Sequence, residues 1–412
     1  MISRVTLLHA KGIYDSDKGE MVWTGLAIEK GKIRERGWFE EMLFRYAGAE
    51  LLDYSDEYVL PGLINTHVHL EFTPDTQICE MFLGETREKR LEKSFEHARE
   101  MLCSGVTTVR DLGSSMEMAQ GLRKREQKTD SGLPRLHLSG MPLTQRRGHL
   151  AFLGEAADSR EELLFAVKQR KEAGCDCIKI IVSGGQNTPG SMPEQDAYDR
   201  ARISLVTEAA HREKLPVAAH CLTTTALVNC MEAGVDCIEH CSCFVRKHPE
   251  NLLARVWNPE KMERYQGDRR LFMTGFSNNY HRLDEVREGR RIPSWQERFW
   301  LDQEKREAEI FNHLRKLGLR PVIGTDGGCG QTYFHETWLE LALLVERCGL
   351  SEQEAIQAAT ATGAEALGLN ETVGRLKEGY AADLITVREN PLKQIRALAK
   401  IEHVMKEGRL VR

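Results

Sequence analysis

Short apolar, β-branched runs alternate with longer amphipathic stretches through the middle of this 412-residue chain. Several of the amphipathic stretches end in a glycine just before the next run, as at Gly105, Gly174, Gly234 and Gly318, and a left-handed glycine commonly ends a helix. Eight strand–helix alternations favour an α/β fold, a parallel (β/α)8 TIM barrel, because no phosphate-binding loop follows the first strand as a doubly wound sheet would need. The predicted strands are residues 59–67, 106–112, 135–141, 176–183, 216–220, 236–240, 270–276 and 321–326.

The two ends of the chain have a different pattern, with short alternating strands separated by glycines. The step from Glu29 to Lys32, which contains Gly31, predicts a hairpin, and Glu407-Gly408 predicts another. Two β segments that flank an α/β body most simply pair with each other. We therefore expect residues 1–58 and 372–412 to form a small β-sandwich domain, and residues 59–371 to form the barrel.

Six polar side chains lie at or near the ends of these predicted strands, and together they predict a catalytic metal centre. The carboxyl ends of parallel barrel strands converge on one mouth, so residues remote in sequence become neighbours there. His67 and His69 are two positions apart and point to the same side, which leaves Val68 facing the helices. Imidazole and carboxylate groups suit zinc and other first-row divalent ions. The six residues are His67, His69, Lys179, His220, His240 and Asp326.

Composition narrows the class of partner. The formal net charge is −5, which gives no basic footprint for nucleic acid or for an anionic membrane. No apolar run reaches 18 residues, so no membrane-spanning helix is expected. The N-terminal residues read as a first strand, and the eleven cysteines are an odd number without a secretion signal. We expect reduced thiols, a cytoplasmic location and a small-molecule substrate, with a homo-oligomer left open.

The order of the motifs resembles the amidohydrolase superfamily nearly end to end. VLPGLINTHVHL is followed by IKI with SGG, AHC, IEH and GTD, and then by EAIQAATATGAEALGL and GRLKEGYAADLI. Within that superfamily the chain is most similar to the branch of prolidase-like Xaa-dipeptidases, arginine carboxypeptidases and ochratoxin-type amidases, with imidazolonepropionase more distant. The resemblance implies two divalent metal ions bridged by a carboxylated lysine and a hydroxide, with zinc as the expected metal.

The resemblance also divides the ligands between the two ions. It implies His67, His69 and Asp326 for the more buried ion, and His220 and His240 for the second. Lys179 would bridge both ions as a carbamate formed with CO2. Charge supports this role, because an ammonium between two cations is repelled and has no lone pair to donate.

The implied reaction is hydrolysis of a carbon–nitrogen amide bond in a dipeptide, an N-acyl amino acid or a cyclic, imidazolone-like amide. Metal ions lower the pKa of bound water and polarise the scissile carbonyl. Asp326 is the expected proton shuttle, and His240 and Lys179 complete the catalytic set. A deaminase or chlorohydrolase acting on a heteroaromatic ring is the alternative. Such sites commonly use one metal, with a glutamate near the fifth strand and no lysine, whereas this chain has Lys179 and Cys221-Leu222-Thr223 after His220. The complete ligand set also disfavours a non-catalytic scaffold.

Substrate contacts are expected after the third and seventh strands. His149 matches the histidine of a Gly-Gly-His in the dipeptidase branch, and would donate a hydrogen bond to the substrate carbonyl. Arg146 and Arg147 depart from that pattern. We expect Arg147 to bind a substrate carboxylate with its forked guanidinium, a solvated loop being the alternative. Tyr280 is expected to line the same pocket, and the Arg- and Glu-rich residues 244–266 and 282–300 to form loops and helices over the mouth.

Overall fold

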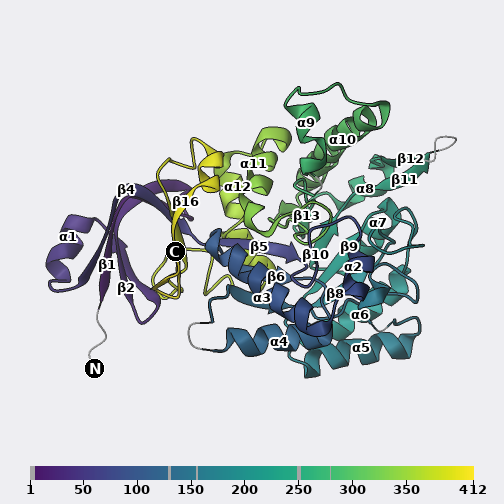
Figure 1. Ribbon diagram of the computed structural model, residues 1–412, viewed down its shortest axis with the longest axis horizontal. Coiled ribbons are helices and arrows are strands. Elements are labelled where there is room, and N and C mark those ends of the chain that lie inside the picture. The colour runs from purple at the N-terminus through teal and green to yellow at the C-terminus, as the bar shows by residue number, and fades with distance from the viewer. Residues whose placement is uncertain (1–4, 129–130, 155, 248–251, 279) are drawn as a thin grey trace.

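The computed structural model describes residues 5–128, 131–154, 156–247, 252–278 and 280–412. It is elongated, with an antiparallel-rich sheet at one end and a larger body of parallel strands and helices at the other (Figure 1). Among the described residues no helix is both long enough and apolar enough to cross a membrane. The cytoplasmic location and the oligomeric state stay predictions.

Both ends of the chain contribute to one seven-stranded sheet, in the order β17-β16-β15-β4-β1-β2-β3. The short helix α1 (Phe39–Arg45) packs against β1 and β2. β4 runs three residues beyond the predicted limit at residue 58, and the division into a sandwich and a barrel domain stays a prediction. The strands are β1 (Thr6–Asp15), β2 (Glu20–Glu29), β3 (Lys32–Gly37), β4 (Glu50–Pro61), β15 (Leu384–Val387), β16 (Ile401–Lys406) and β17 (Arg409–Leu410).

Both predicted hairpins are present in this sheet. Lys30 and Gly31 join β2 to β3 with φ of 52° and 76°, and Glu407 and Gly408 join β16 to β17 with φ of 49° and 73°. Two central residues with positive φ are what a type I′ hairpin requires. The backbone of Ala382 bonds to both turns, through Gly31 O and Gly408 N, so the N- and C-terminal hairpins lie side by side.

Each of the eight predicted body strands has a counterpart, and all pairings between these strands are parallel. The first begins at Leu63, because residues 59–61 belong to β4 of the terminal sheet, and the last spans only Arg320–Pro321 instead of 321–326. The eight strands form a three-stranded and a five-stranded sheet, in the orders β5-β6-β7 and β14-β13-β10-β9-β8. Leu143 N donates to Lys179 O (2.7 Å) at one junction of the two sheets, and Thr66 N donates to Ile323 O (2.8 Å) at the other. The strands are β5 (Leu63–Val68), β6 (Val106–Asp111), β7 (Arg135–Leu138), β8 (Ile178–Ile181), β9 (Val217–Cys221), β10 (Cys237–His240), β13 (Leu271–Met273) and β14 (Arg320–Pro321).

Helices cover the outer side of these strands (Figure 1), and several begin and end at residues that satisfy their free backbone groups. Ser159 forms a capping box with Glu162 at the start of α5. Gly234, with φ of 77°, and Gly318, with φ of 105°, end α7 and α10 in the predicted left-handed conformation. The longer helices are α3 (Arg87–Cys103), α4 (Met116–Glu126), α5 (Arg160–Glu172), α6 (Arg200–Arg212), α7 (Thr224–Ala233), α10 (Trp295–Leu317) and α11 (Thr337–Cys348); the shorter ones are α2 (Ile78–Gly84), α12 (Glu352–Ala358) and α13 (Ala361–Ala366).

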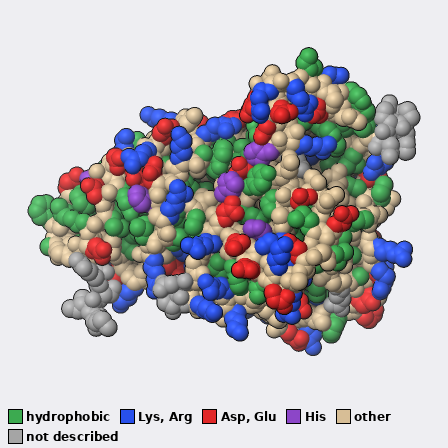
Figure 2. Space-filling model, viewed as in Figure 1, with side chains coloured by type: hydrophobic (Ala, Val, Ile, Leu, Met, Phe, Trp, Pro, Cys, Tyr) green, Lys and Arg blue, Asp and Glu red, His purple; other side chains and the backbone are tan. Residues whose placement is uncertain are grey.

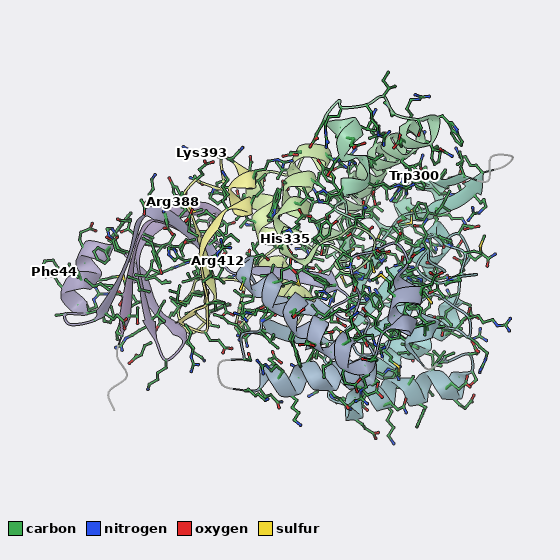
Figure 3. All side chains as sticks on the ribbon, viewed as in Figure 1. Phe44, Trp300, His335, Arg388, Lys393 and Arg412 are labelled. Carbon is green, nitrogen blue, oxygen red and sulfur yellow. The ribbon has the colours of Figure 1, made fainter. Side chains whose placement is uncertain are left out.

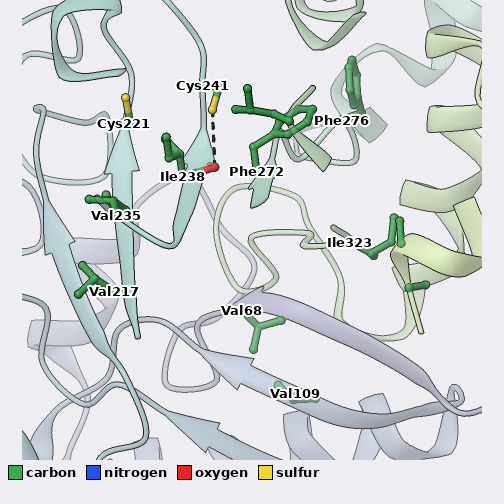
Figure 4. Packing of buried hydrophobic residues seen from close by; sticks show 14 of the residues in the cluster. Val68, Val109, Val217, Cys221, Val235, Ile238, Cys241, Phe272, Phe276 and Ile323 are labelled. Carbon is green, nitrogen blue, oxygen red and sulfur yellow. Dashed lines mark hydrogen bonds between the residues drawn. The ribbon is translucent and has the colours of Figure 1, made fainter. Parts of the chain in front are cut away.

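The largest apolar cluster lies between the parallel strands and these helices (Figure 4). Val68 belongs to it, which confirms that the residue between His67 and His69 faces the helices. Cys221 and Cys241 are fully buried in the same cluster, and the thiol of Cys241 donates to Ile238 O (3.6 Å). Both cysteines therefore act as small apolar side chains, as their position one residue past a histidine predicts.

The charged segment between β10 and β14 forms a hairpin as well as the predicted helices. Lys, Arg, Asp and Glu side chains crowd together over α9 and α10, at the top of the view in Figure 2. Residues 248–251 and 279 of this segment lie outside the described part. Its other elements are β11 (Phe244–Lys247), β12 (Leu252–Arg255), α8 (Pro259–Met262), the 3-10 turn η3 (Tyr280–Leu283) and α9 (Asp284–Arg287).

Candidate metal centre

The six predicted ligands lie on or just beyond the carboxyl ends of the parallel strands, and the structure brings them together. His67 is in β5, Lys179 in β8 and His220 in β9. The imidazole of His240, the last residue of β10, has its centroid 5.0 Å from that of His67 and 4.8 Å from that of His220. Five of the six residues are buried and His240 is partly so. Remote strand ends therefore converge in one small region.

Asp326 occupies the centre of this group. Its Oδ1 atom lies 3.4 Å from Nε2 of His67 and 3.3 Å from Nε2 of His69. The ligand atoms of His67, His240 and Asp326 all lie within 4.8 Å of one another, which is a spacing that can hold a metal ion. A second such group joins His69 and Asp326 to Cys329, a thiol that the sequence analysis did not single out.

Two of the six candidate ligands have a buried polar atom with no hydrogen-bond partner within the described chain. The atoms are Nε2 of His67 and Nζ of Lys179. Buried polar groups almost always have partners, so an unpartnered pair beside other donor atoms calls for an explanation. The lone pairs of neutral imidazoles and the carboxylate of Asp326 are the donors that a bound cation needs, so the residues present fit a metal ion.

The other ring nitrogens are held by acceptor oxygens, which fixes how the rings are turned. His67 Nδ1 lies 2.8 Å from Glu239 Oε2, His69 Nδ1 lies 3.0 Å from Gly113 O, and His220 Nε2 lies 2.9 Å from Gly184 O. An ionised carboxylate and a carbonyl can only accept, so the proton of each ring sits on that nitrogen. The opposite nitrogen then keeps its lone pair, in the way that such partners orient metal-binding histidines.

Glu239 and Arg110 form a buried ion pair behind His67, and neither was predicted. Arg110 Nη2 donates to Glu239 Oε1 (2.9 Å), and Arg110 Nε donates to Thr66 O (2.6 Å). Burial opposes ionisation of Glu239, but the charge of Arg110 and the hydrogen bond to His67 hold its pKa well below the usual range. The available sequence signal was a charged residue inside each of two apolar strands, VTTVRD and CIEH.

Burial also keeps the imidazoles neutral. It lowers the pKa of His67 to about 4 and that of His240 to about 3, because a charged ring loses its hydration there. Neutral imidazole and ionised carboxylate are the forms that bind metals.

The backbone is strained at two of the ligands. His240 has φ of 69° and Asp326 has φ of 60°, in the left-handed region that residues with a Cβ atom rarely occupy. Such conformations cost about 1–3 kcal/mol and occur often at functional sites. His240 ends β10 and Asp326 lies in the loop after β14, and at both positions the ligand atom lies in the region that the candidate ligands share.

A cavity of about 330 Å³ opens onto the ligand set. Its inner lining includes Lys179, His220, His240 and Asp326, and the predicted contact His149. The ring of His149 is buried, with its centroid 4.6 Å from that of His220, and its Nδ1 has no partner in the described chain. The structure thus places His149 beside the ligands, as its sequence position predicts.

The other two predicted substrate contacts lie away from this cavity. Arg147 is exposed, at φ of 63° in the turn that the Gly148 N–Gln145 O hydrogen bond closes, and it is not part of the lining. Tyr280 is also outside the lining, because the guanidinium groups of Arg287 and Arg347 cover its ring at 4.1 and 5.0 Å. Sequence position placed both residues after the right strands but could not give the direction of their side chains.

Residues 58–411 match the amidohydrolase family, and the chain belongs to that family. Ochratoxinase from Aspergillus niger is 26% identical over 99% of this chain and 87% of its own length. Imidazolonepropionase from Clostridium tetani is 23% identical over 94% of this chain and 90% of its own. A solved Xaa-Pro dipeptidase with bound methionine in the active site aligns with a TM-score of 0.82 at 24% identity, over 98% of this chain and 99% of the other. The protein is thus a hydrolase of carbon–nitrogen bonds.

Proposed function

We propose that this hydrolase holds two divalent metal ions, with zinc expected, at the mouth of one (β/α)8 barrel, and cleaves an amide bond in a small substrate. The observation that carries the proposal is the buried, unpartnered amine of Lys179 among four histidines and Asp326. A lysine kept only for structure would bury its ammonium against a carboxylate or carbonyls. An amine without such a partner is suited to covalent modification by CO2.

In this proposal His67, His69 and Asp326 would hold one ion and His220 and His240 would hold the other. Lys179, as its carbamate, would be a ligand shared by both. Carboxylation replaces a cationic group with an anionic ligand, which removes the repulsion between an ammonium and two metal ions. Glu239, through Nδ1 of His67, keeps that ring turned with its lone pair toward the ligand group.

Bound divalent ions would supply an activated water and polarise the scissile carbonyl. The chain's own contribution to proton transfer is Asp326. Its Oδ2 accepts a hydrogen bond from Asn278 Nδ2 (2.9 Å), which keeps the carboxylate fixed in the cavity wall. Asp326 takes a proton during attack on the carbonyl and passes it to the leaving nitrogen. His149, which lines the same cavity as His220, donates a hydrogen bond to the substrate carbonyl.

The substrate is proposed to be a dipeptide, an N-acyl amino acid or a cyclic amide. The similar proteins support this range, because they include a dipeptidase, an ochratoxinase and an imidazolonepropionase. The cavity volume fits small molecules of this size.

Two measurements test the proposal. Metal analysis after expression in zinc-supplemented medium is expected to find close to two ions per chain. A panel of dipeptides, N-acyl amino acids, lactams and hydantoins is expected to include hydrolysed members, with no turnover after chelation and recovery on adding metal. Fewer than two ions would contradict the binuclear centre, and turnover that is indifferent to chelation would contradict metal dependence.

A further inference from the structure

The outer wall of the cavity is built by the charged segment between β10 and β14. Phe244 begins β11, Arg255 ends β12, Arg282 lies in η3, and Trp300 lies on α10. Figure 3 marks Trp300 on α10, on the side of the molecule that carries the β11–β12 hairpin. These residues face the same cavity as the metal ligands, so they are placed to contact the part of a substrate that does not react.

Both carboxylates of this wall are already paired. Glu307 accepts from Arg255 Nη2 (2.8 Å). Glu304 accepts from Arg347 Nη1 (3.0 Å) and also pairs with Arg287. The acidic groups of the wall therefore have guanidinium partners and leave little negative charge to attract a cationic substrate.

Arg282 has a different environment. Its guanidinium lies 5.5 Å from the centroid of the Trp300 ring, where the aromatic face attracts a cation. Within the described residues no carboxylate lies within 4.0 Å of it. Arg282 is exposed where it lines the cavity, so its forked donors can form strong hydrogen bonds with a carboxylate that enters there.

Two guanidinium groups and two carboxylates of the wall line the cavity: Arg255, Arg282, Glu304 and Glu307. Both carboxylates already accept from guanidinium groups, Glu307 from Arg255 and Glu304 from Arg347, so Arg282 is the lining guanidinium group without a carboxylate partner among the described residues. The Nε atom of Arg255 is also buried without a hydrogen-bond partner. An anion bound at this end of the cavity would supply hydrogen-bond acceptors to the guanidinium groups of Arg255 and Arg282.

We propose that Arg282, with Arg255 beside it, binds a carboxylate of the substrate and makes the enzyme selective for amides that carry an acid group. The inference rests on the proposed function and deepens it by naming the substrate class. The substrate would lie across the cavity, with its amide at the metal ligands and its carboxylate at η3 and α10. Trp300 would hold the guanidinium plane in place for a two-point contact. Arg282 thus takes the role expected from the sequence for Arg147.

The test uses matched substrates that differ in one group. A panel of N-acyl amino acids and dipeptides is paired with the same compounds as their C-terminal carboxamides. The wild-type enzyme is expected to prefer the acids. Arg282→Met is expected to lower kcat/KM for the acids by about 10- to 100-fold, the range of one hydrogen bond to a charged group, and to leave the carboxamides within about twofold. Arg282→Lys is expected to keep part of the preference.

Arg290→Met is the matched control, because Arg290 is exposed in the same segment and pairs with Glu288 outside the cavity. Metal content is measured in every variant, and it is expected to stay at the wild-type value. Equal losses on acids and carboxamides, or no loss on either, would overturn the role of Arg282 while hydrolysis itself stands. Faster turnover of the carboxamides by the wild-type enzyme would overturn acid selectivity. Absence of bound metal together with absence of turnover across both series would instead remove the proposed function.

Discussion

The amine of Lys179 is buried where no oxygen of the described chain accepts its hydrogen atoms. Lys179→Ala is therefore expected to cost little in lost internal hydrogen bonds. It should instead lower metal content below two ions per chain and reduce kcat by at least about 100-fold, because the proposed shared ligand is removed. Metal analysis and turnover with the best panel substrate measure both effects. A short carboxylic acid such as propionate, added to the variant, should restore part of each by occupying the vacated space.

Lys168→Ala is the control for this experiment. Lys168 lies on α5 with its side chain 71% exposed, 3.6 Å from Glu172. Its loss should leave metal content and turnover unchanged, because exposed ion pairs contribute less than about 1 kcal/mol. Full metal loading and near-normal turnover of Lys179→Ala would show that the amine has only a packing role.

The buried pair behind His67 gives a second residue-level prediction. Glu239→Gln leaves the Arg110 guanidinium buried without its counter-charge and weakens the acceptor of His67 Nδ1. Removing one partner of a buried ion pair costs about 3–5 kcal/mol. The variant is expected to melt at a clearly lower temperature and to bind metal more weakly, measured by calorimetry and by metal titration. Glu232→Gln, on the exposed side of α7, is the control; equal melting temperatures of the two variants would contradict the role of the pair.

The sequence was sufficient to predict six candidate ligands that the structure brings together, but not the residues that support them. His67, His69 and His220 follow recognisable strands, and strand alternation gives the direction of their side chains. Glu239 meets His67 across 172 positions of the chain, and Asn278 meets Asp326 across 48, so these contacts exist only once the strands have converged. No local pattern marks such a pair.

At the scale of elements, α11 and the loop after β13 are coupled by one buried acid. Glu340 on α11 accepts from Phe276 N (2.9 Å) and Ser277 N (2.7 Å), just before Asn278. Burial raises the pKa of Glu340 from 4.5 to about 7, because the carboxylate loses its hydration there. The folded state then binds a proton more tightly than the unfolded state, and the stabilisation present below about pH 4.5 is lost as pH rises through about 7.

Glu340→Gln removes this pH dependence. The raised pKa of Glu340 corresponds to about 3 kcal/mol of stabilising free energy, which the wild type has lost completely above pH 8. Glutamine has one acceptor oxygen where glutamate has two, and this loss lowers the free energy of unfolding by the same amount at every pH. The difference in melting temperature, variant minus wild type, should therefore become more positive between pH 5 and pH 8. Exposed Glu371 provides the control variant Glu371→Gln; a parallel pH response of wild type and Glu340→Gln would show that Glu340 titrates normally.

Elements whose signals are local were predicted, and those defined by distant contacts were not. The helix ends at Gly234 and Gly318 and the turn at Lys30-Gly31 depend on a few adjacent residues. The wall formed by η3 and α10 has no comparable signal. Its charged residues read as a solvated surface, and only packing across the mouth shows that Arg282 and Trp300 face the cavity.

At the scale of the whole molecule, the terminal sheet is attached to the body through a shared apolar core. Ile385 of β15 and Ile401 of β16 belong to the same buried cluster as Leu102 of α3 and Val106 of β6. Between them lies Gly105, which follows the C-cap Ser104 of α3 and accepts from Leu63 N (2.9 Å) at the start of β5. The junction thus joins the last strands of the chain to the first strands of the body, which two separately read segments of sequence could not show.

Gly105 is where this attachment can be tested. It has φ of 93°, and a Cβ atom there would overlap Ile401 Cδ1 and lie 3.1 Å from Ile385 Cγ2. Gly105→Ala is expected to cost about 1–3 kcal/mol in backbone strain and a further about 1–3 kcal/mol in overpacking. Ile401→Ala alone should cost about 2–5 kcal/mol as a buried truncation. The double variant should lose at least about 1 kcal/mol less stability than the sum of the two single variants. The space left by the Ile401 side chain accepts the methyl group that alanine adds at residue 105, while the backbone strain at residue 105 remains. Unfolding of all three variants in urea measures this, and additive losses would mean that the terminal sheet does not press on Gly105.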